Sequence, residues 1–116
     1  MEMRRADFGE DVASAEFVLL DRDGSSRQAR LRVGRPYEVS SDEWACPVEI
    51  LGFEPRYPDA HGGTSLQALC LAIMLVRSRV EDFISKGGKV LDIVGGHEWD
   101  VKSIAAVFGS TGMNAA

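Results

Sequence analysis

The sequence predicts an α+β fold, a two-layer sandwich in which an antiparallel sheet of four or five strands packs on one long helix. Two observations lead to this prediction. Apolar residues recur at helical spacing across residues 64–86, and short segments with strand character precede and follow this stretch. Because most strands come before the helix and do not alternate with helices, we expect one sheet layer and one helix layer.

The predicted helix at 64–86 has signals at both of its ends. Thr64 and Gln67 match a capping box, in which each side chain satisfies a backbone amide that the helix leaves open. Gly87 follows the last turn, where glycine often adopts a left-handed conformation. Every residue of 68–76 is apolar, which predicts that the first half of the helix is buried on nearly all sides. The second half has only an apolar stripe.

The strand candidates lie on both sides of this helix. Residues 15–21 and 27–33 flank an Asp-Gly turn, and the second segment alternates apolar and polar side chains, which is typical of a β-hairpin with one solvated face. Residues 44–52 form a further strand, with Pro47 placing it at an edge or at a bulge. A last strand is expected at 89–94.

Two boundaries divide the chain into three parts. Residues 1–14 are polar and lack periodicity, which predicts a flexible arm. Residues 15–108 are expected to form a single domain that ends in a short helix at 101–108, capped by Asp100. Residues 109–116 are mostly small, which predicts a frayed tail.

Composition excludes several classes of protein. Hydrophobic residues make up 45% and charged residues 27% of the 116 residues, as in ordinary globular domains. The net charge of −5 argues against a nucleic-acid or anionic-membrane surface, which needs clustered Lys and Arg. No apolar run reaches the roughly 20 residues of a membrane span. No secretory signal is visible at the N-terminus, so we expect a cytoplasmic protein without a membrane segment.

One ligand-binding candidate is the loop that leads into the helix, with a second histidine further along the chain. Helix N-termini bind anions through free backbone amides, so an anion or other ligand is one interpretation of the loop. The other is a sharp glycine turn into a helix cap. The candidate residues are His61, Gly62, Gly63, Thr64 and His97.

Trp99 lies in a polar loop between Glu98 and Asp100, and these three residues are the candidates for contact with a partner protein. A metal site needs three or four converging ligands, whereas the two histidines lie in different loops. Cys46 and Cys70 have apolar neighbours and are expected in the core. We therefore predict no metal, no cofactor and no catalytic residue.

Two patterns resemble a family of small bacterial proteins classed as a domain of unknown function. They are W-x-C-x-V-x-I-x-G at 44–52 and S-x-Q-A-L-x-L-A at 65–72. The resemblance covers roughly residues 33–94. In size and layout such proteins are similar to immunity proteins, which neutralise secreted bacterial toxins. The resemblance implies no catalytic residues.

Three functional hypotheses follow. The first is a non-enzymatic, cytoplasmic protein-binding factor, with a toxin-neutralising or accessory role. The second is a small enzyme or ligand-binding protein that uses residues 61–64 and His97, and it requires both histidines in one pocket. The third is a structural homodimer through the free sheet face, which requires an apolar patch formed by Val18, Leu20 and Leu51.

Overall fold

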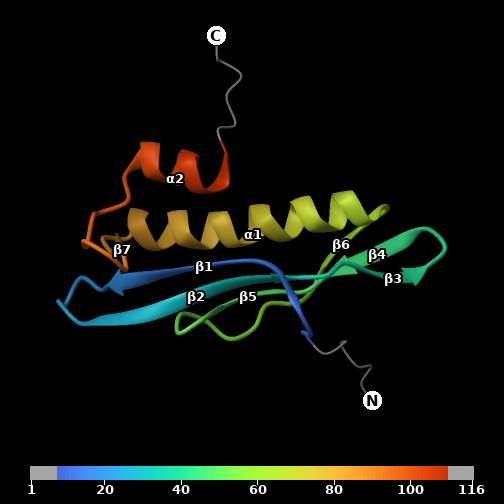
Figure 1. Ribbon diagram of the computed structural model, residues 1–116, viewed down its shortest axis with the longest axis horizontal. Coiled ribbons are helices and arrows are strands. Elements are labelled where there is room, and N and C mark those ends of the chain that lie inside the picture. Colours follow the sequence, from blue (N-terminus) through green and yellow to red (C-terminus); the bar gives the residue numbers. More distant parts are fainter. Residues whose placement is uncertain (1–7, 110–116) are drawn as a thin grey trace, which may run out of the picture.

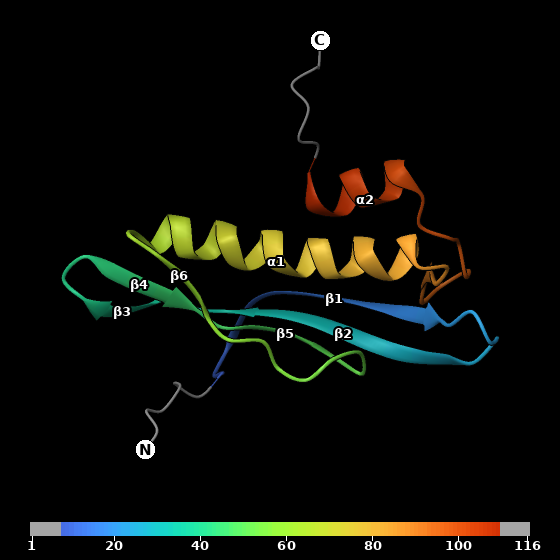
Figure 2. The same ribbon diagram turned by 180° about the vertical axis from the view of Figure 1, so that it is seen from behind.

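The computed structural model describes residues 8–109 and shows an α+β fold (Figure 1). Helix α1 (Ser65–Ser85) covers one face of the sheet, and helix α2 (Val101–Phe108) runs back alongside the second half of α1 (Figures 1 and 2). The strands are β1 (Asp11–Leu20), β2 (Ser26–Gly34), β3 (Tyr37–Ser40), β4 (Glu43–Cys46), β5 (Val48–Leu51), β6 (Ala60–Gly62) and β7 (Lys89–Asp92). The predicted fold class is confirmed.

The strands form two antiparallel sheets. The larger sheet has the order β5-β2-β1-β7, and the smaller one has the order β3-β4-β6. The predicted hairpin is the β1–β2 pair, in which Phe17 lies opposite Ala29 and Ala15 lies opposite Leu31. Because side chains alternate between the faces of a strand, this register directs Phe17, Ala29 and Leu31 toward α1.

The predicted strand at 44–52 is two strands that belong to different sheets. Pro47 separates β4 from β5, and its carbonyl accepts a hydrogen bond from the Gly34 amide at 2.9 Å. Proline has no amide to donate to a ladder, so the break at this residue leaves no donor unsatisfied. The neighbours Cys46 and Val48 are fully buried. The chain therefore passes from the smaller to the larger sheet at a buried corner.

The core lies between α1 and the inner face of the larger sheet. Four residues of α1 at successive four-residue steps are buried, namely Ala68, Ala72, Val76 and Val80. Small and β-branched side chains let the helix lie close to the strands. They meet large side chains from the sheet that are at most 1% exposed, among them Phe17, Leu19, Ile50 and Val90.

No element of residues 8–109 covers the opposite face of α1, so the prediction that residues 68–76 are buried on nearly all sides is wrong. Leu66 is 67% exposed, Met74 is 62% exposed, and Cys70 between them is exposed as well. The sheet covers only one stripe of a helix, and α2 lies beside the other half of α1. Within residues 8–109, no helix has the length and apolar character needed to cross a membrane.

Both helix starts are capped as predicted. Thr64 accepts a hydrogen bond from the Gln67 amide at 3.0 Å, and Gln67 Oε1 accepts one from the Gly63 amide at 2.6 Å. In α2, Asp100 and Ser103 form a reciprocal capping box. The hydrogen bond from the Ser103 amide holds the pKa of Asp100 below its usual range.

The first strand begins earlier than predicted, because β1 starts at Asp11 and not at residue 15. The Asp11 carboxylate accepts hydrogen bonds from Arg30 at 2.7 Å and from Arg32 at 2.8 Å, which attaches the start of the strand to β2. The rest of the predicted arm up to residue 7, and the predicted tail from residue 110, lie outside the described residues.

The two faces of α1 predict two different responses to truncation. We expect Val76→Ala to lower the free energy of unfolding by about 2 kcal/mol, because it removes buried methyl groups. Met74→Ala should change it by less than about 0.5 kcal/mol, because this side chain is mostly in solvent. Urea denaturation of both variants measures the difference. Equal losses would contradict the orientation of α1.

Candidate functional site

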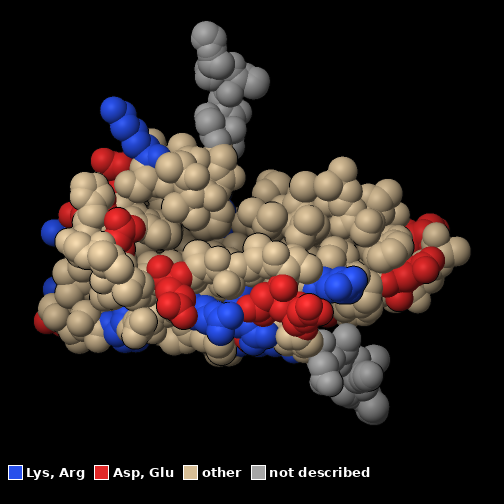
Figure 3. Space-filling model, viewed as in Figure 1, with Lys and Arg blue, Asp and Glu red and all other residues tan. Residues whose placement is uncertain are grey.

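The first half of α1 presents an uncharged apolar surface to solvent. Leu66, Cys70 and Met74 follow one another at four-residue steps, and each lies two positions from a buried residue, which places them on the opposite side of the helix. Leu71 is exposed beside them. Figure 3 shows a continuous surface without charged side chains over this half of α1, bordered by charged residues below it and at the β3–β4 end. We call these four residues the α1 outer face.

The predicted ligand loop at 61–64 is part of a small sheet. His61 and Gly62 belong to β6 and pair with β4, and His61 Nδ1 lies 2.6 Å from the Glu43 carboxylate. Gly62 packs directly on α1, because a Cβ atom there would lie 2.7 Å from the Ala68 amide nitrogen. Thr64 is occupied as the helix cap. Gly62 and Thr64 therefore serve the packing and the capping of α1.

The second set of predicted residues lies after β7. Trp99 is only 6% exposed, its ring centroid is 5.1 Å from that of Phe17, and its Nε1 donates a hydrogen bond to Asp92 at 2.7 Å. The Trp99 ring is therefore part of the core and is not accessible to a partner in this structure. Glu98 and His97 are exposed. The local sequence did not reveal this burial, because it depends on the loop folding back onto β7.

His61 and His97 do not share a pocket. His61 precedes the first residue of α1 and His97 follows the strand after its last residue, so they lie at opposite ends of the helix (Figure 1). A helix of 21 residues is about 30 Å long. In the described part of the chain, no group of three or more His, Cys, Asp or Glu side chains is arranged to hold a metal ion.

The outer face of the larger sheet is charged. Val18 and Leu51 lie on strands that β2 separates, and their β2 neighbours are Gln28 and Arg30. Ion pairs continue along this face, with Arg32 bonded to Asp11 at 2.8 Å and to Glu49 at 2.7 Å. The hydrogen bond with Asp11 raises the pKa of Arg32. The continuous apolar patch expected for a sheet-face homodimer is absent from the described residues.

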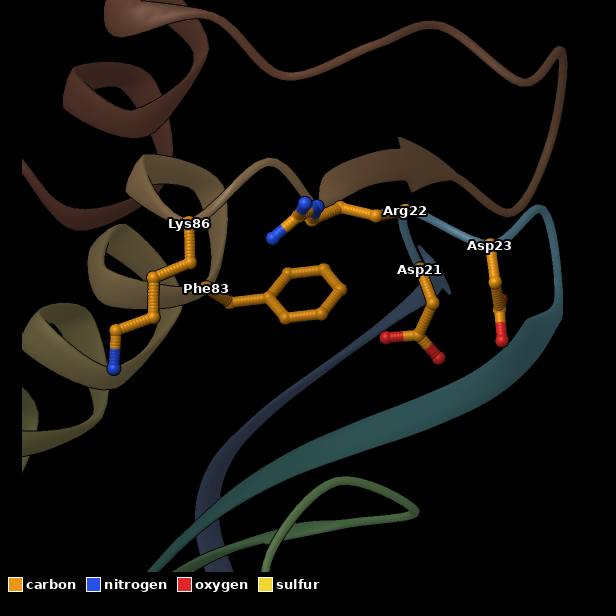
Figure 4. Close-up of a pocket in the computed structure, with 6 residues that line it drawn as sticks. Asp21, Arg22, Asp23, Phe83 and Lys86 are labelled. Carbon is orange, nitrogen blue, oxygen red and sulfur yellow. The ribbon is translucent and has the colours of Figure 1, made fainter.

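A surface hollow of about 670 Å³ opens between the β1–β2 turn and the end of α1. Figure 4 shows Arg22 and Phe83 extending into this space, with Asp21 and Asp23 on the turn beside them. Gly87 lies against the Arg22 side chain with a φ of +99°, and a Cβ atom at this residue would lie 2.7 Å from Arg22 Cδ. A side chain at position 87 would therefore displace Arg22.

The two aspartates beside this hollow have hydrogen-bond partners, whereas the nearby arginine has no carboxylate partner among the described residues. Asp21 binds Arg27, and Asp23 accepts hydrogen bonds from Ser25, whose hydroxyl lowers the pKa of Asp23. Among the arginines of residues 8–109, Arg22 alone has no carboxylate partner. A guanidinium beside an aromatic ring is suited to a small carboxylate ligand. Sequence reasoning missed this hollow because its residues come from two distant segments.

The two cysteines differ in reactivity. Cys46 is fully buried and its thiol donates to the Gly34 carbonyl at 3.4 Å. Burial raises the pKa of the Cys46 thiol to about 11, so the thiol is neutral at physiological pH. Cys70 is exposed on the α1 outer face, which corrects the prediction that both cysteines lie in the core.

We expect iodoacetamide at about pH 8 to alkylate Cys70 and to leave Cys46 unmodified, because only an accessible thiolate reacts. Intact and peptide mass spectrometry measure the modification at each residue. Denaturant should expose Cys46 and give double labelling. Rapid labelling of Cys46 in the native protein would contradict its burial.

The fold and its surfaces define a small α+β domain with a charged sheet face and an apolar helix face. A family model described as a domain of unknown function, DUF6968, matches residues 15–97, which is more than half of the chain. The chain therefore belongs to the DUF6968 family. Both patterns that carried the resemblance, at 44–52 and 65–72, lie within the matched residues. No curated protein and no solved structure matched the chain.

Proposed function

We propose that this protein is a non-enzymatic binding factor that docks a partner protein on the α1 outer face. The observation that carries the proposal is the exposure of Leu66 and Met74 on a helix half that is apolar on both sides. A helix that is apolar all round is normally buried. Here the domain itself covers only the side toward the sheet, so a partner is expected to cover the other.

The charged face of the larger sheet is a less favourable docking surface than the α1 outer face. Along the sheet side, charged residues pair with one another, as Arg32 does with Glu49, and such a surface is well solvated. On the α1 outer face no charged residue interrupts residues 64–76. Apolar patches bordered by polar residues mark protein interaction sites. The partner should therefore present a largely apolar surface of its own at this contact.

We further propose that the protein acts in the cytoplasm, as a toxin-neutralising or accessory factor. Its small size and layout, which are similar to those of immunity proteins, support this role. A net charge of −5 favours rapid encounter with a basic partner, whereas the apolar contact on α1 provides the stable part of the complex.

The test uses two glutamate substitutions one turn apart on the same side of α1. Met74→Glu places a charge within the α1 outer face and should reduce capture of the partner at least about tenfold, because the charge must be desolvated in the complex. Tagged protein would be used to capture partners from lysate of the source cell, with quantification by mass spectrometry.

Ser78→Glu is the matched control, because Ser78 is exposed one turn further along and lies outside the apolar surface. It should capture the same stoichiometric partner as the unsubstituted protein. Equal capture by both variants would contradict docking on the α1 outer face. Circular dichroism would show that both variants keep the native fold.

A second candidate function is the binding of a small carboxylate ligand in the hollow beside Arg22. The unpaired guanidinium next to Phe83 favours it. We expect benzoate, which has both a carboxylate and a ring, to shift the amide resonances of Phe83 and Gly88 in a nuclear magnetic resonance titration. Arg22→Gln should abolish the shifts, and Lys102→Gln on α2 should retain them. Shifts that persist in Arg22→Gln would contradict this site.

A further inference from the structure

The strand β1 has an open edge that no element of the described chain occupies. It is a strand of ten residues, but β7 pairs only with its last four, from Phe17 to Leu20. Residues 13–16 pair with β2 on one side, and within residues 8–109 no strand pairs with them on the other. An exposed strand edge is a template for another extended backbone.

The ladder pattern identifies which backbone groups face this opening. Val90 accepts a hydrogen bond from the Trp99 amide and Asp92 donates one to the His97 carbonyl, so both residues direct their backbone groups away from β1. Leu91, which lies between them on β7, therefore directs its backbone groups toward its partner Val18 on β1. Because the pattern alternates along an antiparallel strand, the amides and carbonyls of Ser14 and Glu16 point to the open side.

An apolar cavity lies beside the same edge. It has a volume of about 150 Å³, is partly open to solvent and is lined by residues of β1, β2, α1 and α2. Space is left on the sheet side of the cavity because the small side chains of Ala13 and Ala15 occupy the inward positions of β1 there. Further along β1 the large side chains of Phe17 and Leu19 fill these positions. Val107 of α2 also lines the cavity. The cavity therefore offers space for an apolar side chain that enters from the open edge.

We propose that the open edge of β1 binds an extended segment of another protein by β-strand addition. Backbone hydrogen bonds to Ser14 and Glu16 would align the segment, and one of its inward side chains would fill the cavity against Val107. Strand addition to a free edge, with pockets for alternate side chains, is an established mode of peptide recognition. This surface is distinct from the α1 outer face, so it adds a second contact to the proposed binding function.

The chemistry of the edge favours a foreign segment over a second copy of this chain. Pairing of two β1 edges would bring only Ala13 and Ala15 of the copy to the inner side, and alanines would leave the cavity empty. On the outer side, Arg30 binds Asp11 and leaves the adjacent Glu16 without an ion pair among the described residues. A segment with apolar side chains inward and basic side chains outward satisfies both requirements.

The test is titration with a capped peptide of alternating valine and lysine, about seven residues long. Nuclear magnetic resonance and hydrogen exchange would be recorded on the complete protein. We expect slower exchange of the Ser14 and Glu16 amides, with no change at Val18. A peptide with methylated amides on the side that faces β1 should bind at least about tenfold more weakly, because it cannot donate to the edge.

Two protein variants complete the test. Ser14→Pro removes the edge amide without removing a bond to β2 and should weaken binding, whereas Ser14→Ala keeps the amide and should bind as the unsubstituted protein does. Val107→Asp should also weaken binding. Met74→Glu should leave it unchanged, which separates this proposal from the α1 outer face.

Other outcomes would overturn the proposal. They are equal binding of the methylated peptide, protection located away from β1, and absence of binding. Concentration-dependent protection of Ser14 and Glu16 without peptide would show that a second copy occupies the edge, and it would overturn the assignment to a foreign segment.

Discussion

The close packing of one narrow stripe of α1 on the larger sheet is the contact on which the rest of the structure depends. Ala68 and Ala72 bring the first half of the helix near the strands, and Val76 and Val80 continue the contact along the second half. Burial of such side chains supplies most of the stabilisation of a small domain. Because this contact uses only one side of the helix, it also leaves the opposite side without cover.

The smaller sheet supports the first half of this helix. At Pro47 the chain passes from the smaller sheet into the larger one, β4 and β6 contact α1, and Gly62 meets the helix backbone without a side chain between them. The residues on both sides of the corner, including Cys46, are completely buried. The corner is therefore as well buried as the centre of the larger sheet.

Local signals were sufficient to predict both helices and the β1–β2 hairpin, but they did not reveal the short strands β3 and β6 or how the elements cover one another. The caps at Thr64 and Asp100 depend on residues three positions away, so the sequence reveals them directly. Burial of Trp99 depends on contact with Phe17, which is distant in the chain. The exposure of Met74 depends on how far the sheet and α2 reach, and no local pattern contains that information. The hollow at Arg22 escaped prediction for the same reason.

The distribution of charge indicates which side of the molecule makes its contacts. On the sheet side the charged groups satisfy one another, as in the bonds of Arg32 with Asp11 and Glu49, so another molecule that covered this face would have to desolvate paired ions. On the helix side an apolar surface is already poorly solvated, and its removal from water is favourable. The open edge of β1 lies between these two sides, and it offers backbone groups that no strand of residues 8–109 pairs with, next to an apolar cavity. The surfaces of this domain whose burial against a partner is most favourable are therefore the helix side and the open edge of β1.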